Sequence, residues 1–379
     1  MEDHGHTVSE RDMCVYILPT LMDCQYTADT ICEIESGYET ANMTVPTPEK
    51  IVGLAVPPRP LLSVSSAAVK RFVKDQNIPI GILEEPYFSY YINLYEPDFK
   101  TKTAFAKFLN AVTKAGGSEC FLDKYYAIRD NILESIKDKP SYQEFLAADM
   151  GKYAVTGINI PNIKDTNIYT ADNHGKYFLS VDMRAANFQA MKLFDPDIID
   201  DADTYDEFIL RFTDSEYFRE SKYTRQVIFG NINPKRQITI QHFYIGEVLK
   251  VFLNHGLINP EHIRVYNNDE FVVEWDSYID QKELSRLGKI AKEATGVDVK
   301  CTSYCLNNIA ADYFVKEYQD GTFTFKNVPV TVFPQVYKAY RGLQLNDMDT
   351  VFQFEGRLVR FLEPVITARD ILKKGPARL

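Results

Sequence analysis

Apolar residues recur at helical spacing through much of the first half of the chain. From about residue 61 to residue 150, positions three and four apart are apolar and those between them are polar, as in amphipathic helices. The run TAFAKFLNAVTKAGG (residues 103–117) ends on two glycines, a typical helix C-terminus. Two further helices are predicted in residues 125–150, separated at Pro140. We therefore expect a mainly helical domain over residues 61–165.

A different order of patterns follows in residues 166–325. The run KYFLSVDM (176–183) predicts a strand, and helical patterns follow it up to residue 256. The last of these helices has clear end signals, with Asn233 as N-cap, Pro234 at the first helical position and Gly256 at the end. HIRVYNNDEFVVEW (262–275) predicts a hairpin, QKELSRLGKIAKEATG (281–296) a helix, and VDVKCTSYC (297–305) a strand. This order predicts an α+β fold, with an antiparallel sheet and helices on one face.

The two ends of the chain have their own character. Residues 1–60 mix short apolar runs with Thr, Glu and Pro and end in VPPRP, which predicts an N-terminal arm and linker. Residues 326–379 predict a small β-rich tail, with a hairpin turning at Glu355-Gly356. Two aromatic runs, PYFSYYINLY (86–95) and VFPQVYKAY (332–340), are interpreted as core, with base stacking as the alternative.

Composition narrows the class of protein. The chain is 45% hydrophobic and 25% charged, which is typical of a globular protein, and it contains no apolar run long enough to span a membrane. Its acidic start does not resemble a secretory signal, and its six scattered cysteines contain no CxxC pair. We expect an intracellular, cytoplasmic protein without a membrane partner. The net charge of −11 argues against non-specific coating of nucleic acid but allows one local basic groove.

One acidic residue stands out against this background. Asp182 ends the apolar strand YFLSVDM, where a carboxylate is costly to desolvate unless something pairs with it. In an antiparallel sheet the first strand can lie beside the hairpin, so Asp182 could meet Asp269 and Glu270. Three neighbouring carboxylates repel one another, and a divalent cation relieves that repulsion. Mg²⁺, or Mn²⁺ in its place, suits such hard oxygen ligands, and two ions could clamp a phosphoryl transfer.

These two motifs resemble those of palm-fold nucleotidyltransferases. SVDMR and VYNNDEFVV are similar to the Asp-Gly-Arg and Ser-Asp-Glu elements of the tRNA-His guanylyltransferase family. The hairpin also resembles the Gly-Gly-Asp-Glu-Phe hairpin of diguanylate cyclases, and template-dependent polymerases and reverse transcriptases share the layout. The resemblance implies a palm-like catalytic domain, in which Asp182 and Asp269 hold the two metal ions. Glu270 would assist them, and the backbone carbonyl of Met183 would add a ligand.

The resemblance covers residues 176–305, and the chain departs from each family. Met183 stands where the guanylyltransferases have glycine. Asn267 and Asn268 replace both glycines of the cyclases, and reverse transcriptases normally have a second aspartate in place of Glu270. The motifs therefore support the superfamily better than any single member.

Basic residues near these motifs are candidates for binding phosphate. In SKYTRQVIFGNINPKRQ (221–237), Lys222 and Arg225 lie three apart on one helix face, and Lys235 and Arg236 lie in the first turn of the next helix. Cations are disfavoured at a helix start, where free amides attract anions, so a bound phosphate would explain them. Arg184 could reach a phosphate or pair with a neighbouring acid. A solvated surface is the alternative for all of them.

The sequence thus predicts a metal-dependent nucleotidyltransferase. It would add nucleotides from a nucleoside triphosphate to the end of RNA or DNA bound in a local basic groove. One alternative is a non-enzymatic structural or assembly protein, for example of viral origin, that retains an inactive palm-like domain. A further alternative is a nucleotide cyclase.

Overall fold

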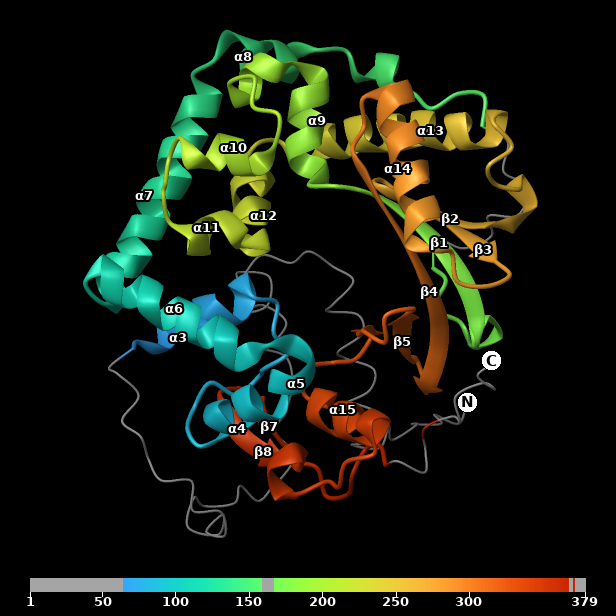
Figure 1. Cartoon of the computed structure of the whole chain (residues 1–379). Helices are drawn as coiled ribbons and strands as arrows, with labels where there is room; N and C mark the ends of the chain where they lie inside the picture. The colour runs from blue at the N-terminus through green and yellow to red at the C-terminus, as the bar shows by residue number, and fades with distance from the viewer. Residues whose placement is uncertain (1–63, 159–166, 368–370, 372–379) are drawn as a thin grey trace, which may run out of the picture.

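The fold combines a large set of helices with one antiparallel sheet. A computed structural model describes residues 64–158, 167–367 and 371. The arm and linker expected in residues 1–60 lie outside the described residues. In Figure 1, helices α6, α7 and α8 run along one side of the molecule and the sheet along the other, while α4, α15 and the β7–β8 hairpin lie together at the bottom.

Helices precede, interrupt and follow the sheet strands in the chain. Before the first strand lie α3 (Ser66–Asp75), α4 (Tyr87–Leu94), α5 (Glu96–Phe99), α6 (Thr101–Ala115), α7 (Ser118–Lys137) and α8 (Pro140–Ala147). Between the first two strands lie α9 (Ala186–Phe194), α10 (Tyr205–Leu210), α11 (Glu216–Glu220), α12 (Lys222–Gly230) and α13 (Pro234–Asn254). Helix α14 (Gln281–Thr295) connects β3 to β4, and α15 (Phe333–Arg341) follows β6.

The helix ends lie where the sequence signals them. Helix α6 is capped by Gly116 and α14 by Gly296, and both glycines adopt positive φ angles, 93° and 76°. Pro140 begins α8 directly after α7 ends. The Asn233 side chain accepts a hydrogen bond from the Arg236 amide at the start of α13. These end signals are confirmed.

The main sheet has six strands and is antiparallel throughout. The strands are β1 (Lys176–Met183), β2 (Ile263–Tyr266), β3 (Glu270–Trp275), β4 (Val299–Ala310), β5 (Tyr313–Tyr318) and β6 (Phe323–Lys326). Their spatial order is β2-β3-β1-β4-β5-β6. The first four strands and their helices therefore form a βαββαβ unit of the ferredoxin-like type, with the strand from KYFLSVDM beside the hairpin as predicted.

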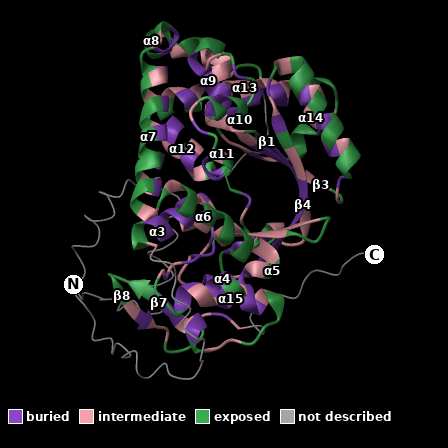
Figure 2. Ribbon diagram, turned by 60° about the vertical axis from the view of Figure 1, so that its left-hand side comes forward, coloured by how far each residue is buried: buried purple, intermediate pink, exposed green. Residues whose placement is uncertain are grey.

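The two faces of β1 differ in character. Leu179, Val181 and Met183 pack in a core cluster with residues of α13 and α14. The alternate residues Phe178, Ser180 and Asp182 lie on the opposite face, which we call the polar face. Buried residues follow β1 and β4 in Figure 2, whereas α14 has exposed residues along its outer side. The expected sheet with helices packed on one face is therefore confirmed.

A second core cluster joins parts of the chain that are distant in sequence. It contains residues from α3 to α8, from α9 to α13, and from β5 and α15. Tyr244 of α13 packs against this cluster and also against the cluster that β1 forms with α13 and α14, which we call the core beneath the sheet. Apolar packing therefore crosses the expected domain boundaries at residues 165 and 325.

The C-terminal tail is mixed rather than β-rich. The hairpin of β7 (Val351–Phe354) and β8 (Arg357–Arg360) turns at Glu355-Gly356, as predicted. The aromatic run before it, residues 332–340, forms helix α15, in which large side chains recur three and four residues apart. Phe333 and Tyr337 contact Tyr95, so this run belongs to the core. No helix among the described residues is long and apolar enough to cross a membrane.

Candidate functional site

Strand register brings the expected acidic residues to one place. Asp182 of β1 lies directly opposite Glu270 of β3. The Met183 amide donates a hydrogen bond of 2.8 Å to the Asp269 carbonyl, which holds this residue of the hairpin turn beside the end of β1. Residues opposite each other in an antiparallel pair have their side chains on the same face. Two motifs about 90 residues apart in the sequence therefore meet at the end of β1.

Burial and like charge act together on Asp182. Burial, and after it the neighbouring charges of Asp269 and Glu270, together raise the pKa of Asp182 to about 6, against the opposing effect of Lys222 and Lys300. The pKa of Asp269 is also raised, first by burial and then by Glu270. The sequence predicts this repulsion between neighbouring carboxylates, which is typical of a site that binds a cation.

The carboxylates do not by themselves enclose a metal ion. Glu270 accepts a hydrogen bond of 2.6 Å from the Ser180 hydroxyl, so its carboxylate is turned along β1. Among the described residues, no three His, Cys, Asp or Glu side chains converge as a metal-binding group. Mg²⁺ is commonly held by one or two carboxylates together with substrate phosphates. The hard oxygen donors of Asp182 and Asp269 fit that kind of site, not a site built from protein ligands alone.

Asp182 does not act as a helix cap, although an Asp between a strand and a helix often has that role. Helix α9 begins after Ala185, and no side chain caps its first turn. The Met183 side chain is buried in the core beneath the sheet, and only its backbone could contribute to a site.

Lysines from four elements lie around the carboxylates. Lys222, at the start of α12, is exposed, and its charge lowers the pKa of both Asp182 and Asp269. Lys300 of β4 lies directly opposite Asp182. Lys316 of β5 and Lys326 of β6 lie further across the polar face, where the charges of Glu270 and Asp182 act on both.

The lysines of β4, β5 and β6 are absent from the sequence-based prediction. Their placement depends on the register of strands that follow the recognised motifs. One signal was present in the run YFVKEY, where Lys316 alternates with Phe314 and Tyr318 and so shares their face. A lysine on the aromatic face of a strand is unusual, because burial penalises its charge.

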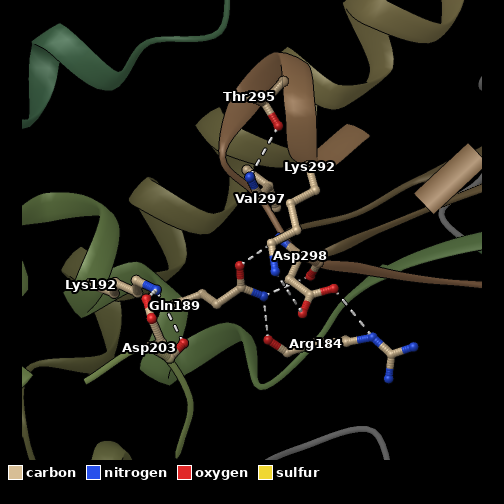
Figure 3. Close-up of polar contacts among 8 residues, drawn as sticks. All are labelled: Arg184, Gln189, Lys192, Asp203, Lys292, Thr295, Val297 and Asp298. Carbon is tan, nitrogen blue, oxygen red and sulfur yellow. Dashed lines mark hydrogen bonds and ion pairs between the residues drawn. The ribbon is translucent and has the colours of Figure 1, made fainter. Parts of the chain in front are cut away.

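Arg184 directly follows β1 and pairs with the residue that directly precedes β4. Its guanidinium forms an ion pair of 3.4 Å with Asp298. Buried Gln189 fixes the backbone there, since its amide donates to the carbonyls of Arg184 and Asp298 and accepts from the Asp298 amide (Figure 3). Arg184 also lines a cavity of about 580 Å³ beside α14. The sequence predicts that Arg184 either reaches a phosphate or pairs with a neighbouring acid, and this ion pair favours the second alternative.

The other basic candidates have different surroundings. The Arg225 guanidinium lies 5.3 Å from the ring centroid of Tyr205, and burial lowers its pKa. Arg236 donates to the carbonyls of Phe145 and Ala148, so it caps the C-terminus of α8. Lys235 is exposed at the start of α13. Only Lys222 of this group acts on the carboxylates.

A buried polar network fixes the start of α12. Asp75 of α3 accepts hydrogen bonds from Arg71, from Tyr217 at 3.0 Å and from Ser221 at 2.7 Å. Arg71 also donates to Thr224 at 2.7 Å. Ser221 is the N-cap of α12 and directly precedes Lys222 in the chain. The helical region thereby positions the lysine that faces the carboxylates.

Helix α13 also contacts the hairpin turn. His242 of α13 contacts the Asn267 carbonyl through Nδ1 at 3.2 Å, and its ring lies against that of Tyr266. The Tyr266 hydroxyl donates back to the His242 carbonyl at 2.9 Å. Gly246 allows this close approach, because a Cβ there would lie 2.7 Å from the Tyr266 hydroxyl oxygen.

Comparison with known proteins identifies no relative. No protein-family model, curated protein or solved structure matches the chain. The functional argument therefore depends on the geometry of the site.

Proposed function

We propose that the protein is a palm-type, metal-dependent nucleotidyltransferase that transfers nucleotides from a nucleoside triphosphate to a nucleic-acid end. The observation that carries this proposal is the pairing of Asp182 with Glu270, with Asp269 adjacent, on a βαββαβ sheet. Carboxylates at this position, with lysines around them, are what phosphoryl transfer requires for positioning and charge neutralisation.

Each part of the site has a distinct task in this proposal. Asp182 and Asp269 bind and orient the cations, and Glu270 adds negative charge beside them. Two Mg²⁺ or Mn²⁺ ions, when bound, would supply Lewis-acid activation of the attacking hydroxyl and neutralise charge on the leaving group. Lys222 and Lys300 balance the carboxylates and offer N–H donors to phosphate oxygens. RNA or DNA would bind near these lysines, since the protein is acidic overall.

Incorporation of a labelled nucleotide into a primer, with Mg²⁺ or Mn²⁺, tests the proposal. Asp182→Asn and Asp269→Asn should each reduce incorporation by at least about a hundredfold, because each removes a direct metal ligand. Asp312→Asn removes an exposed carboxylate at the β4–β5 turn and should leave incorporation unchanged. Equal activity in all three variants would contradict the proposal.

One observation favours a second candidate, a structural or assembly protein with an inactive palm-like domain. The Glu270 carboxylate accepts a hydrogen bond from the Ser180 hydroxyl, which leaves it less available to a metal ion. This candidate predicts no incorporation by the wild-type protein with any nucleoside triphosphate. It also predicts no change in thermal stability when metal and nucleotide are added together.

A further inference from the structure

Lys316 and Lys326 share the polar face, and the charge of a third lysine, Lys222, acts on Lys326. Lys222 starts α12, Lys316 lies on β5 and Lys326 on β6. Burial lowers the pKa of Lys326, and the charge of Lys222 lowers it further, so the two ammonium groups repel each other. Lys326 acts in the same direction on Lys316. Within the described residues, none of the three forms a hydrogen bond or an ion pair at its ammonium group.

Lys316 is the most deeply placed of the three. It is 8% exposed, and its ammonium nitrogen lies 4.2 Å from the ring centroid of Tyr304 and 5.8 Å from that of Tyr169. The rings supply some cation–π stabilisation, and the ammonium group has no hydrogen-bond acceptor among the described residues of the protein. Burial lowers the pKa of Lys316 to about 8, against the opposing charges of Glu270 and Asp182.

Strand register puts the two sheet lysines side by side. Lys316 lies opposite Thr324, and Lys326 lies opposite Phe314, so the lysines are diagonal neighbours on one face of the β5–β6 pair. The charges of Glu270 and Asp182 act on both lysines, but neither carboxylate forms an ion pair with them among the described residues. The two ammonium groups therefore still repel each other, and a bound anion would relieve that repulsion. The arrangement therefore indicates an anion site, on the same face as the carboxylates.

We propose that Lys316 and Lys326, together with Lys222, bind the polyphosphate chain of the nucleoside triphosphate. A polyphosphate concentrates several negative charges in a short chain and can meet three neighbouring ammonium groups at once. A phosphodiester carries a single charge per linkage and would leave some of them unpaired. The identity of the ligand rests on the proposed function, whereas the presence of an anion site rests on the lysines alone.

Calorimetric titration with inorganic pyrophosphate, in EDTA and near pH 7, tests the site without metal or turnover. The wild-type protein should bind saturably. Lys316→Met and Lys326→Met should each weaken binding by about tenfold, because each removes a charge-assisted hydrogen bond. Lys282→Met, an exposed lysine of α14, is the matched control and should bind as the wild type does.

Further variants separate the possible outcomes. Asp182→Asn should bind pyrophosphate at least as tightly as the wild type, since it removes a negative charge, even though it abolishes incorporation under the proposed function. The difference between the wild type and Lys316→Met should shrink from pH 7 to pH 9, as Lys316 loses its proton. Unchanged affinity in both Lys316→Met and Lys326→Met would overturn the proposal. Tighter binding of a single-stranded oligonucleotide than of pyrophosphate, lost in the same variants, would assign the lysines to a nucleic-acid backbone and would also overturn it.

Discussion

At the scale of single residues, Asp182 is the central residue of the candidate site. Its position at the end of an apolar strand predicted a partner, and the structure shows Asp269 and Glu270 beside it instead of a neutralising ion pair. The pKa values of Asp182 and Asp269 are both raised. Perturbed carboxylates that face one another are typical of functional sites. The neighbours could be predicted because a hairpin beside a strand allows few arrangements. The conformation of the Glu270 side chain, held by Ser180, could not, because it depends on a local hydrogen bond.

Asp182→Asn should stabilise the protein near neutral pH. The folded-state pKa of about 6 exceeds the ordinary value of 3.8, so the folded state binds more protons between these values and loses stability as pH rises through this window. Removing the charge should therefore raise the free energy of unfolding at pH 7.5 by up to about 3 kcal/mol, the free energy that corresponds to this difference in pKa. At pH 4 and below, the difference should largely disappear.

Thermal unfolding of the two proteins at pH 4 and pH 7.5 measures this effect. Asp312→Asn, at an exposed position, should change the melting temperature at neither pH. A melting temperature of Asp182→Asn below that of the wild type at pH 7.5 would show that the carboxylate is stabilised by a partner, and so would contradict its assignment to a repulsive group.

At the scale of elements, helix ends and hairpins followed their local signals. Glycine caps, the proline at the start of α13 and the turn at Glu355-Gly356 all lie where the sequence indicates, because each depends on backbone preferences of adjacent residues. From the sequence, residues 332–340 are placed in the core but assigned to no element, although the spacing of their large side chains is helical. The register of β5 and β6, and with it Lys316 and Lys326, could not be predicted, since strand pairing depends on contacts that are distant in the sequence.

Gly246→Ala should destabilise the junction of α13 with the hairpin. Alanine normally favours a helix interior, but here its Cβ would lie 2.7 Å from the Tyr266 hydroxyl oxygen and displace a hydrogen-bonded ring. We expect a loss of about 1–3 kcal/mol in denaturant unfolding. Gly288→Ala is the matched control inside α14, where the nearest atom is 3.6 Å away, and should gain about 0.5–1 kcal/mol. Similar effects of the two changes would mean that the junction is not tightly packed.

At the scale of the whole molecule, the helical region and the sheet depend on each other. The Arg71–Asp75 network fixes α12, and α12 brings Lys222 to the carboxylates of the sheet. Apolar packing continues from the first helices into α9 and α13, which also contact the core beneath the sheet. The separate domains expected from the sequence stay a prediction, since charge and pattern along the chain do not show which helices share a core.

Asp75→Ala should lower the stability of both regions together. It leaves Arg71 buried without its charge partner, which costs about 3–5 kcal/mol. Trp275 of β3, the single tryptophan, reports on the sheet by fluorescence, and far-UV circular dichroism reports mainly on the helices. Both transitions should shift to lower denaturant by the same amount. Arg286→Ala, in an exposed pair of α14, should shift neither, and a shift in circular dichroism alone would indicate independent unfolding.

The most direct test of the central claim is a titration of Mn²⁺ in the presence of a non-hydrolysable nucleoside triphosphate, followed by electron paramagnetic resonance. The claim is that Asp182 and Asp269 together hold catalytic metal. The wild type and Asp312→Asn should both bind Mn²⁺ saturably beyond what the nucleotide binds alone, and Asp182→Asn and Asp269→Asn should each weaken this binding by at least about tenfold. Equal Mn²⁺ binding in all four proteins, or no protein-dependent binding at millimolar concentration, would contradict it.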